Sequence, residues 1–207
     1  SVTYQGDIKT AGGGAHGIFA QSAGPSGANT VTVTVTGSVI ATGADAHAIM
    51  AQSVKQSGSS SVGAADITVT LNNGATVKGG KPGTNNNGAG VQFLDGVNNL
   101  LTTNGTLSSA NDISGYAVAA TGGNDSVVNN GYMIGNVDLG SGTNKLNVDG
   151  SGRFDMGTTV KLGSGNALTN YGIMSPGGDN VLLTTALTGN LVQSNGTYTV
   201  TLDGAQV

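Results

Sequence analysis

The 207-residue sequence has no cysteine and no tryptophan, and it contains only three prolines. Without cysteine, the chain has no disulfide framework and no thiol redox chemistry. Charged residues make up 9% of the chain and aromatic residues 4%, which is sparse for a compact globular enzyme. The net charge of -4 is too small for the self-repulsion that keeps chains disordered, so we expect this chain to fold.

Positively charged residues are scarce. Seven Lys and Arg residues give no basic surface that could neutralise a phosphate backbone, so nucleic acid is not an expected partner.

The sequence also has few signals for helices. No apolar run approaches the roughly 18 residues that a membrane-spanning helix needs. Gly, Asn, Thr and Ser interrupt every window of about ten residues, which argues against helices.

Strand signals are abundant by contrast. Residues 30–36, 66–71 and 197–202 alternate between Thr or another polar residue and Val, Ile, Leu or Tyr. Strict alternation of β-branched residues is typical of strands with one buried face. The sequence therefore predicts an all-β protein built from short strands.

One segment occurs twice at a fixed offset. The sequence G-A-H-G-I-F-A-Q-S at 14–22 returns as D-A-H-A-I-M-A-Q-S at 45–53, which places His16 and His47 31 residues apart. A catalytic histidine is normally a single positioned base, so a duplicated one indicates architecture. Self-similarity at a period of 20 to 50 residues indicates a solenoid.

The later chain repeats less regularly. A Gly, then Asn or Asp, precedes an apolar anchor in four places, and three of these anchors are followed by an Asn-Gly or Asn-x-Gly turn. The anchors are Leu100, Val127, Leu146 and Leu168, and the turns that follow anchors or strands include 73–74, 104–105, 130–131 and 170–172. Asn and Gly adopt left-handed backbone conformations at low cost, so we expect them at corners between strands.

These patterns predict a right-handed parallel β-helix of roughly eight coils. Val, Ile and Leu would line its interior, and Asn residues at equivalent corners would form hydrogen-bonded ladders. The Gly-, Ser- and Asn-rich segments 23–29, 54–61 and 79–88 exceed what a coil needs and would loop outward from the early coils. The alternative fold is an antiparallel sandwich or barrel, which does not explain the 31-residue offset.

The C-terminal part resembles a known family. Residues 170–178, N-Y-G-I-M-S-P-G-G, and 187–203, L-T-G-N-L-V-Q-S-N-G-T-Y-T-V-T-L-D, resemble the last coils of bacterial autotransporter (type V secretion) passenger domains. The resemblance implies that 1–186 are β-helical passenger coils and that 187–207 begin an autochaperone-like segment continuous with them.

The same resemblance carries expectations about the full-length protein. A signal peptide would precede Ser1 and an outer-membrane translocation barrel would follow Val207. The passenger would be secreted and displayed on the surface of a Gram-negative bacterium, in adhesion, autoaggregation or biofilm formation. Its partners would be glycans or proteins of host or bacterial surfaces, or other passengers.

Two groups of residues suggest metal binding. His16 and His47 would stand on adjacent coils, but no acidic residue recurs beside both, so a stacked structural pair is the favoured interpretation. Residues 139–146 resemble the calcium-binding nonapeptide of repeat-in-toxin proteins. Asn144 and Asn166 replace its aspartate, while Asp125 is isolated, so corner amides that satisfy backbone groups are favoured over a calcium site.

The sequence gives even less support for a catalytic site than for a metal site. The nearest thing to a carboxylate cluster is Asp138 with Asp149 or Asp155, with Lys145 and Arg153 as possible cationic neighbours, and three serines lack the G-x-S-x-G context of a nucleophile. The Thr-x-Thr pairs are attributed to β-propensity, since an ice-binding face would need them on many successive coils. The three serines are Ser22, Ser53 and Ser175. The Thr-x-Thr pairs are Thr32 with Thr34 and Thr68 with Thr70.

The sequence thus assigns no catalytic, cofactor-binding or metal-binding residue and predicts a non-enzymatic adhesive stem. A β-helical polysaccharide-degrading enzyme and a purely structural spacer or folding segment are the alternatives.

Overall fold

The computed structural model describes residues 1–24, 29–55, 65–83 and 88–202. In this part of the chain nineteen strands form one sheet, and the single helical element is a short 3-10 helix, η1 (Asp112–Ser114). Every pairing between named strands is parallel. The all-β class with a large parallel sheet is therefore confirmed, and the antiparallel alternative is excluded.

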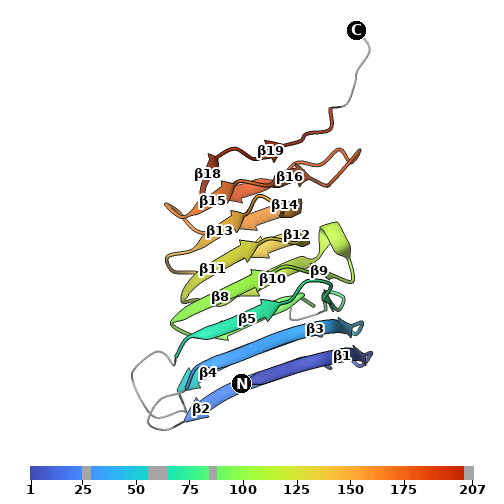
Figure 1. The fold of residues 1–207 in the computed structure, drawn as a ribbon, viewed down its shortest axis with the longest axis vertical. Coiled ribbons are helices and arrows are strands. Elements are labelled where there is room, and N and C mark those ends of the chain that lie inside the picture. Colours follow the sequence, from blue (N-terminus) through green and yellow to red (C-terminus); the bar gives the residue numbers. More distant parts are fainter. Residues whose placement is uncertain (25–28, 56–64, 84–87, 203–207) are drawn as a thin grey trace.

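The strands lie in three columns, and the chain visits the columns in the same order in each coil. Figure 1 shows successive strands stacked one above another along the long axis. The first column holds eight strands of the described chain, in agreement with the roughly eight coils expected. They are β1 (Val2–Thr10), β3 (Val31–Ala41), β5 (Ile67–Leu71), β8 (Asn98–Thr103), β11 (Asn124–Asn129), β13 (Lys145–Val148), β15 (Ala167–Asn170) and β18 (Asn190–Gln193).

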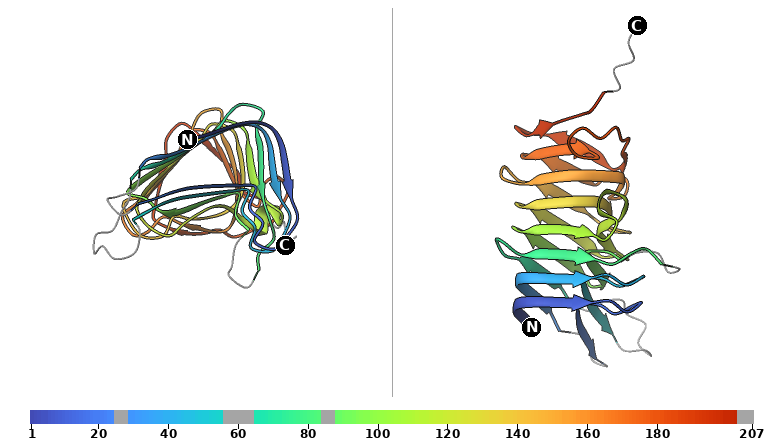
Figure 2. Two further views of the ribbon diagram at one scale, coloured as in Figure 1. Left: turned by 90° about the horizontal axis from the view of Figure 1, so that it is seen from below. Right: turned by 90° about the vertical axis from the view of Figure 1, so that its right-hand side faces the viewer.

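The second column follows the first around a corner. It comprises the C-terminal halves of β1 and β3, then β6 (Thr76–Gly79), β9 (Thr106–Ser109), β12 (Tyr132–Asp138), β14 (Arg153–Lys161), β16 (Ile173–Pro176) and β19 (Thr197–Tyr198). The third comprises β2 (Ile18–Gly24), β4 (Ile49–Lys55), β7 (Val91–Asp95), β10 (Tyr116–Ala120), the ends of β12 and β14, and β17 (Ala186–Thr188). Seen along the stack, the three columns give a three-sided outline (Figure 2).

Apolar side chains fill the space between the columns, because alternate residues of each strand point inward. In the first column the inward residues form one file from coil to coil. It consists of Val33, Val69, Leu101, Val127, Leu146 and Leu168, each at most 1% exposed. The expected anchor Leu100 is wrong by one residue, since it is 36% exposed and pairs with Ser126, while Leu101 lies inside.

The corners between the first and second columns differ from the expectation in one respect. Gly74 adopts a positive φ of 80°, as predicted for a left-handed corner. Gly105 and Gly131 do not; instead a Cβ on Gly131 would lie 2.1 Å from the carbonyl oxygen of Gly105 in the coil below. These later glycines are needed for the close approach of stacked backbones.

Two other expectations concern the chain's organisation. Of the segments expected to loop outward, 23–29 and 54–61 lie largely outside the described residues, as do residues 84–87 of 79–88. The described beginning of 79–88 does not loop outward, because Gly79 ends β6, Gly80 is buried and Lys81 forms a parallel bridge with Ala44. The expected boundary between 186 and 187 falls within β17, and β18 and β19 continue the first and second columns.

Candidate functional site

The repeated histidines stack on each other in adjacent coils. The ring centroids of His16 and His47 are 5.0 Å apart and the ring planes are inclined by 21°. The backbone N–H of His47 donates to Nδ1 of His16, and the N–H of Ala89 donates to Nδ1 of His47, both at 3.0 Å. Each imidazole is therefore a neutral acceptor for the next coil, and the stacked-pair interpretation is confirmed.

The surroundings of His47 favour this neutral form. Its residue is only 6% exposed, and burial is the main cause that lowers its pKa to about 4, with the neighbouring His16 adding to the effect and Asp45 opposing it. Burial also lowers the pKa of His16. Within the described residues, no three His, Asp or Glu side chains gather closely enough to hold a metal ion.

The carboxylates suspected of clustering are kept apart. Asp138 ends β12 in the third column and pairs with Lys161 at 3.2 Å, whereas Asp155 lies on β14 in the second column and pairs with Arg153 at 2.9 Å. The structure does not bring Asp149 into either pair. The nearest thing to a carboxylate cluster in the sequence is therefore not a cluster of Asp138 and Asp155 in the structure.

The Asp155 pair belongs to a network that the sequence did not reveal. Arg153 lies 5.6 Å from the ring centre of Tyr132 and also pairs with Asp179 at 2.9 Å, and the Tyr132 hydroxyl donates to Asp155. Burial and the hydrogen bond to Asp155 raise the pKa of Tyr132 to about 12. Asp179 comes from the segment after β16, so the network fastens that segment to the second column.

The three suspected serines have structural roles. Ser22 and Ser53 occupy equivalent positions on β2 and β4, and their hydroxyl oxygens accept the backbone N–H groups of Asn29 and Ala65. The hydroxyl of Ser175 donates to the carbonyl of Gly178 at 3.1 Å. Each of these bonds joins a strand to residues that follow it.

Threonines form a longer file than the sequence suggested. Register places Thr3, Thr34, Thr70 and Thr102 above one another on four successive coils, while the neighbouring file pairs Thr32 with Thr68 and then reaches Leu100. Thr-x-Thr pairs therefore do not continue beyond β5 within these strands, although single threonines of one file do. Across the first five coils, the outward residues of the first column include Thr, Gln, Asn and Ser and no charged residue within its described strands.

An inner ladder of polar side chains marks the corner where the chain enters the first column. Register and hydrogen bonds align Asn99, Asp125, Asn144 and Asn166. Asn144 donates through Nδ2 to the carbonyls of Leu139 and Leu162 at 3.2 and 3.0 Å, and Asn166 donates to the carbonyl of Gly142 at 2.9 Å. The interpretation of Asn144 and Asn166 as corner amides that satisfy backbone groups is confirmed.

Asp125 is the exception in this ladder. It is 1% exposed, and its Oδ1 accepts a 2.8 Å hydrogen bond from Nδ2 of Asn99, while its Oδ2 has no hydrogen-bond partner. Burial raises the pKa of Asp125 to about 6, although the bond from Asn99 opposes the shift. A carboxylate here lacks the N–H donor that its neighbours in the ladder possess.

An outer ladder runs beside the inner one. Asn98 donates to Oδ1 of Asp66 at 3.0 Å, Asn124 donates to Oδ1 of Asn98 at 3.1 Å, and the backbone N–H of Thr143 donates to Oδ1 of Asn124 at 3.0 Å. All four residues are exposed or half-buried. The ladder expected from repeated corner asparagines is therefore present on the surface as well.

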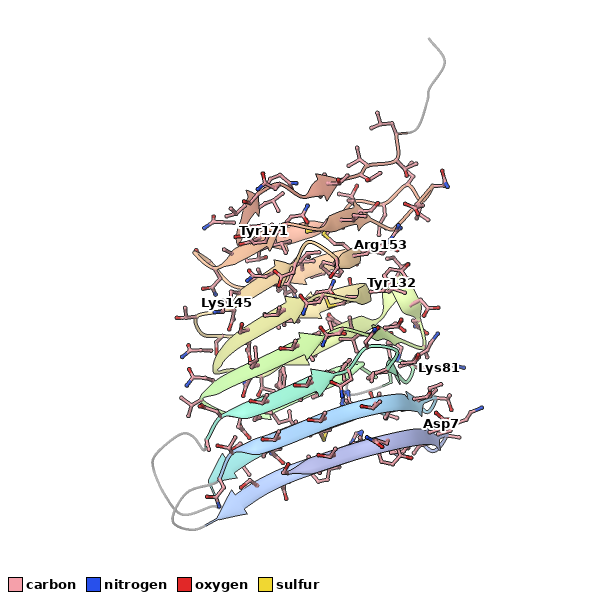
Figure 3. The ribbon with its side chains drawn as sticks, in the orientation of Figure 1. Asp7, Lys81, Tyr132, Lys145, Arg153 and Tyr171 are labelled. Carbon is pink, nitrogen blue, oxygen red and sulfur yellow. The ribbon has the colours of Figure 1, made fainter. Side chains whose placement is uncertain are left out.

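A groove of about 650 Å³ follows these ladders along the stack. It is lined by Asp66, Thr68, Asn98, Asn99, Leu100, Asn124, Asp125, Ser126, Thr143, Asn144 and Lys145. Lys145 lies on the opposite side of the view from Tyr132 and Arg153, so the groove and the Arg153 network are separate (Figure 3). The repeated G-N/D signal pointed to this corner, but it did not show that the corners form a groove.

No helix in the described part of the chain has the length and apolarity to cross a membrane. Comparison of the chain with models of known families, with curated proteins and with solved structures finds no match.

Proposed function

We propose that this chain is a right-handed parallel β-helix and the stem of a secreted autotransporter adhesin. In the full-length protein it would be displayed on the outer membrane of a Gram-negative bacterium and act without catalysis in adhesion, autoaggregation or biofilm formation. The parallel columns and their regular order support the β-helix. The C-terminal sequence resemblance supports the autotransporter assignment.

One observation carries the adhesive role: the outward residues on the first column are mostly polar, and none of them is charged, over five coils. The residues concerned are Thr3, Gln5, Thr32, Thr34, Thr36, Thr68, Thr70, Asn72, Leu100, Thr102, Asn104, Ser126, Val128 and Asn130. Such a surface forms many weak hydrogen bonds, and it does not repel a like surface. Multivalency strengthens weak contacts when many copies on one cell meet many on another.

Asp138 and Asp155, the carboxylates that the sequence singled out, do not form the pair that polysaccharide hydrolysis would need. A hydrolase needs two carboxyl groups on either side of one bond. Asp138 and Asp155 lie on different columns, and each is paired with a cation. The structural spacer remains as the competing proposal, and the following experiment separates it from an adhesin.

The test places charge on the uncharged face. The chain is displayed at high density on bacteria that do not aggregate by themselves, and the settling of the culture is measured. Thr34→Lys with Thr70→Lys should slow settling several-fold, because lysines on the face repel one another. Thr76→Lys with Thr158→Lys, at exposed positions of β6 and β14 away from the first column, is the matched control and should settle like the parent. Equal settling of both variants, or no settling by the parent, would favour the spacer.

A further inference from the structure

The groove along the two ladders has the regular spacing of the coils. It is built from the beginnings of β5, β8, β11 and β13, which pair in register, so its walls repeat from coil to coil. The four strands are separated by three intervals of about 4.8 Å, so the groove is roughly 14 Å long. A ligand that fits such walls repeats along its own length.

The outer ladder, on one side of the groove, offers hydrogen-bonding groups that are already held in place. The amides of Asn98 and Asn124 hold each other through the 3.1 Å bond, yet each amide has two N–H donors and two acceptor lone pairs, so donor and acceptor capacity remains. Because the ladder already fixes these side chains, little conformational entropy is lost when they bind a ligand. Neighbouring hydroxyl groups, which both donate and accept, match this wall.

Beside the outer ladder, the outward side chains of β5, β8 and β11 line the groove with hydroxyl and apolar groups. Thr68, Leu100 and Ser126 follow one another in register on three coils, and Leu100 is 36% exposed although it is apolar. An exposed aliphatic side chain between two hydroxyl-bearing side chains suits a ligand with alternating C–H and O–H surfaces. Sugar rings have such surfaces.

Other ligand classes fit less well. A peptide that adds to a sheet needs a free strand edge, but β8 and β11 each have a parallel neighbour on both sides. Phosphate groups need several cations, and among the residues that line the groove only Lys145 is one. A metal ion finds no group of three acidic or histidine ligands in the described residues.

We propose that this groove binds a linear, uncharged oligosaccharide, with Asn98 and Asn124 as hydrogen-bonding residues and Leu100 as the apolar contact. The proposal rests on the adhesive function for its biological role and names the ligand class that an adhesin of this shape would take. Thr68, Leu100 and Ser126 belong to both the groove and the uncharged face, so contacts between passengers would come from the residues of that face outside the groove.

The test is isothermal titration of the purified chain with three neutral probes, cellotetraose, maltotetraose and chitotetraose. We expect at least one to bind, and Leu100→Glu to weaken that binding about tenfold or more, which corresponds to about 1.4 kcal/mol. Thr102→Glu is the matched control, because it places the same charge on the same face of β8 two residues further on, outside the groove. It should bind like the parent, and thermal unfolding of all variants establishes that they fold.

Failure of this proposal is distinct from failure of the adhesive function. If none of the three probes binds, if Leu100→Glu binds as tightly as the parent, or if a sulfated tetrasaccharide binds more tightly than the neutral probes, the groove assignment is overturned. If a neutral probe binds in solution but displayed cells do not settle or attach, the groove assignment stands and the adhesive function is overturned.

Discussion

Two buried side chains, His47 and Asp125, show how single residues set the response of this stack to pH. Each occupies a position in a file of residues that hydrogen-bond from coil to coil. His47 fits its file as a neutral acceptor, whereas Asp125 is a buried carboxyl group with one oxygen unpartnered, and burial favours its neutral, protonated form. Their contributions to stability therefore change in opposite directions as the pH falls.

For His47 we predict a loss of stability in acid. Its pKa is about 4 in the folded chain and 6.5 ordinarily, so its contribution is complete above pH 6.5 and is lost as the pH falls through 4. At about 1.4 kcal/mol per pH unit, the loss is on the order of 3 kcal/mol. His47→Asn, whose Oδ1 lies where Nδ1 of His47 accepts the Ala89 N–H, should remove this loss in urea unfolding series between pH 7 and pH 4. His16→Asn is the control with the smaller expected effect, and an equal effect of the two would contradict this role of His47.

For Asp125 we predict the reverse. Its folded pKa of about 6 lies above the ordinary 3.8, so its contribution is complete below pH 3.8 and is lost as the pH rises through 6. Asp125→Asn restores the amide that the neighbouring positions have and should stabilise the fold at pH 7 by about 1 to 3 kcal/mol. The measurement is urea unfolding at pH 7 and pH 4. The gain should shrink at pH 4, and a variant less stable than the parent at pH 7 would refute this role.

At the scale of the element, the corners show two uses of glycine. Gly74 is needed for its positive φ and has open space around it, whereas Gly131 is needed because stacked backbones approach closely. An Asn-Gly pair looks the same in sequence in both places. The difference arises because β5 and β6 are separated by a wider turn, while the later strands turn directly above the corner of the previous coil.

We therefore predict unequal costs for alanine at these two corners. Gly74→Ala should cost about 1 kcal/mol, the penalty for a side chain in the left-handed region. Gly131→Ala should cost at least about 3 kcal/mol, because its Cβ would meet the Gly105 carbonyl and the coils would have to separate. Guanidinium unfolding of both variants measures the difference. Similar midpoints for the two would show that the corner relaxes easily.

At the scale of the whole molecule, burial falls off at the last described coil. Leu168 and Leu191 are consecutive members of the same inward file, yet Leu168 is 1% exposed and Leu191 46%. β18 pairs with β15 on one side, whereas strands such as β8 and β11 pair on both sides. Stability is therefore expected to vary along the stack, as in other arrays of stacked repeats.

We predict that amide hydrogen exchange will follow this gradient. The backbone amides of β8, β11 and β13 should exchange by global unfolding, and those of β18 and β19 should exchange at least about tenfold faster by local opening. Mass spectrometry of peptides after timed exchange in D2O measures both groups in one sample. Uniform protection over all coils would mean that the end coil is as stable as the interior.

The sequence alone was sufficient for the all-β class, the parallel stacking and the paired histidines, because alternation and the 31-residue offset are local or directly repeated signals. The tertiary structure decided that Leu101 and not Leu100 lies inside, since a shift of one residue exchanges the two faces of a strand. It also decided that Arg153 joins Tyr132, Asp155 and Asp179, and that the corner ladders border a groove. The Arg153 network and the groove depend on which residues lie above one another in neighbouring coils. Because the coils differ in length, this register cannot be read from the spacing of residues along the chain.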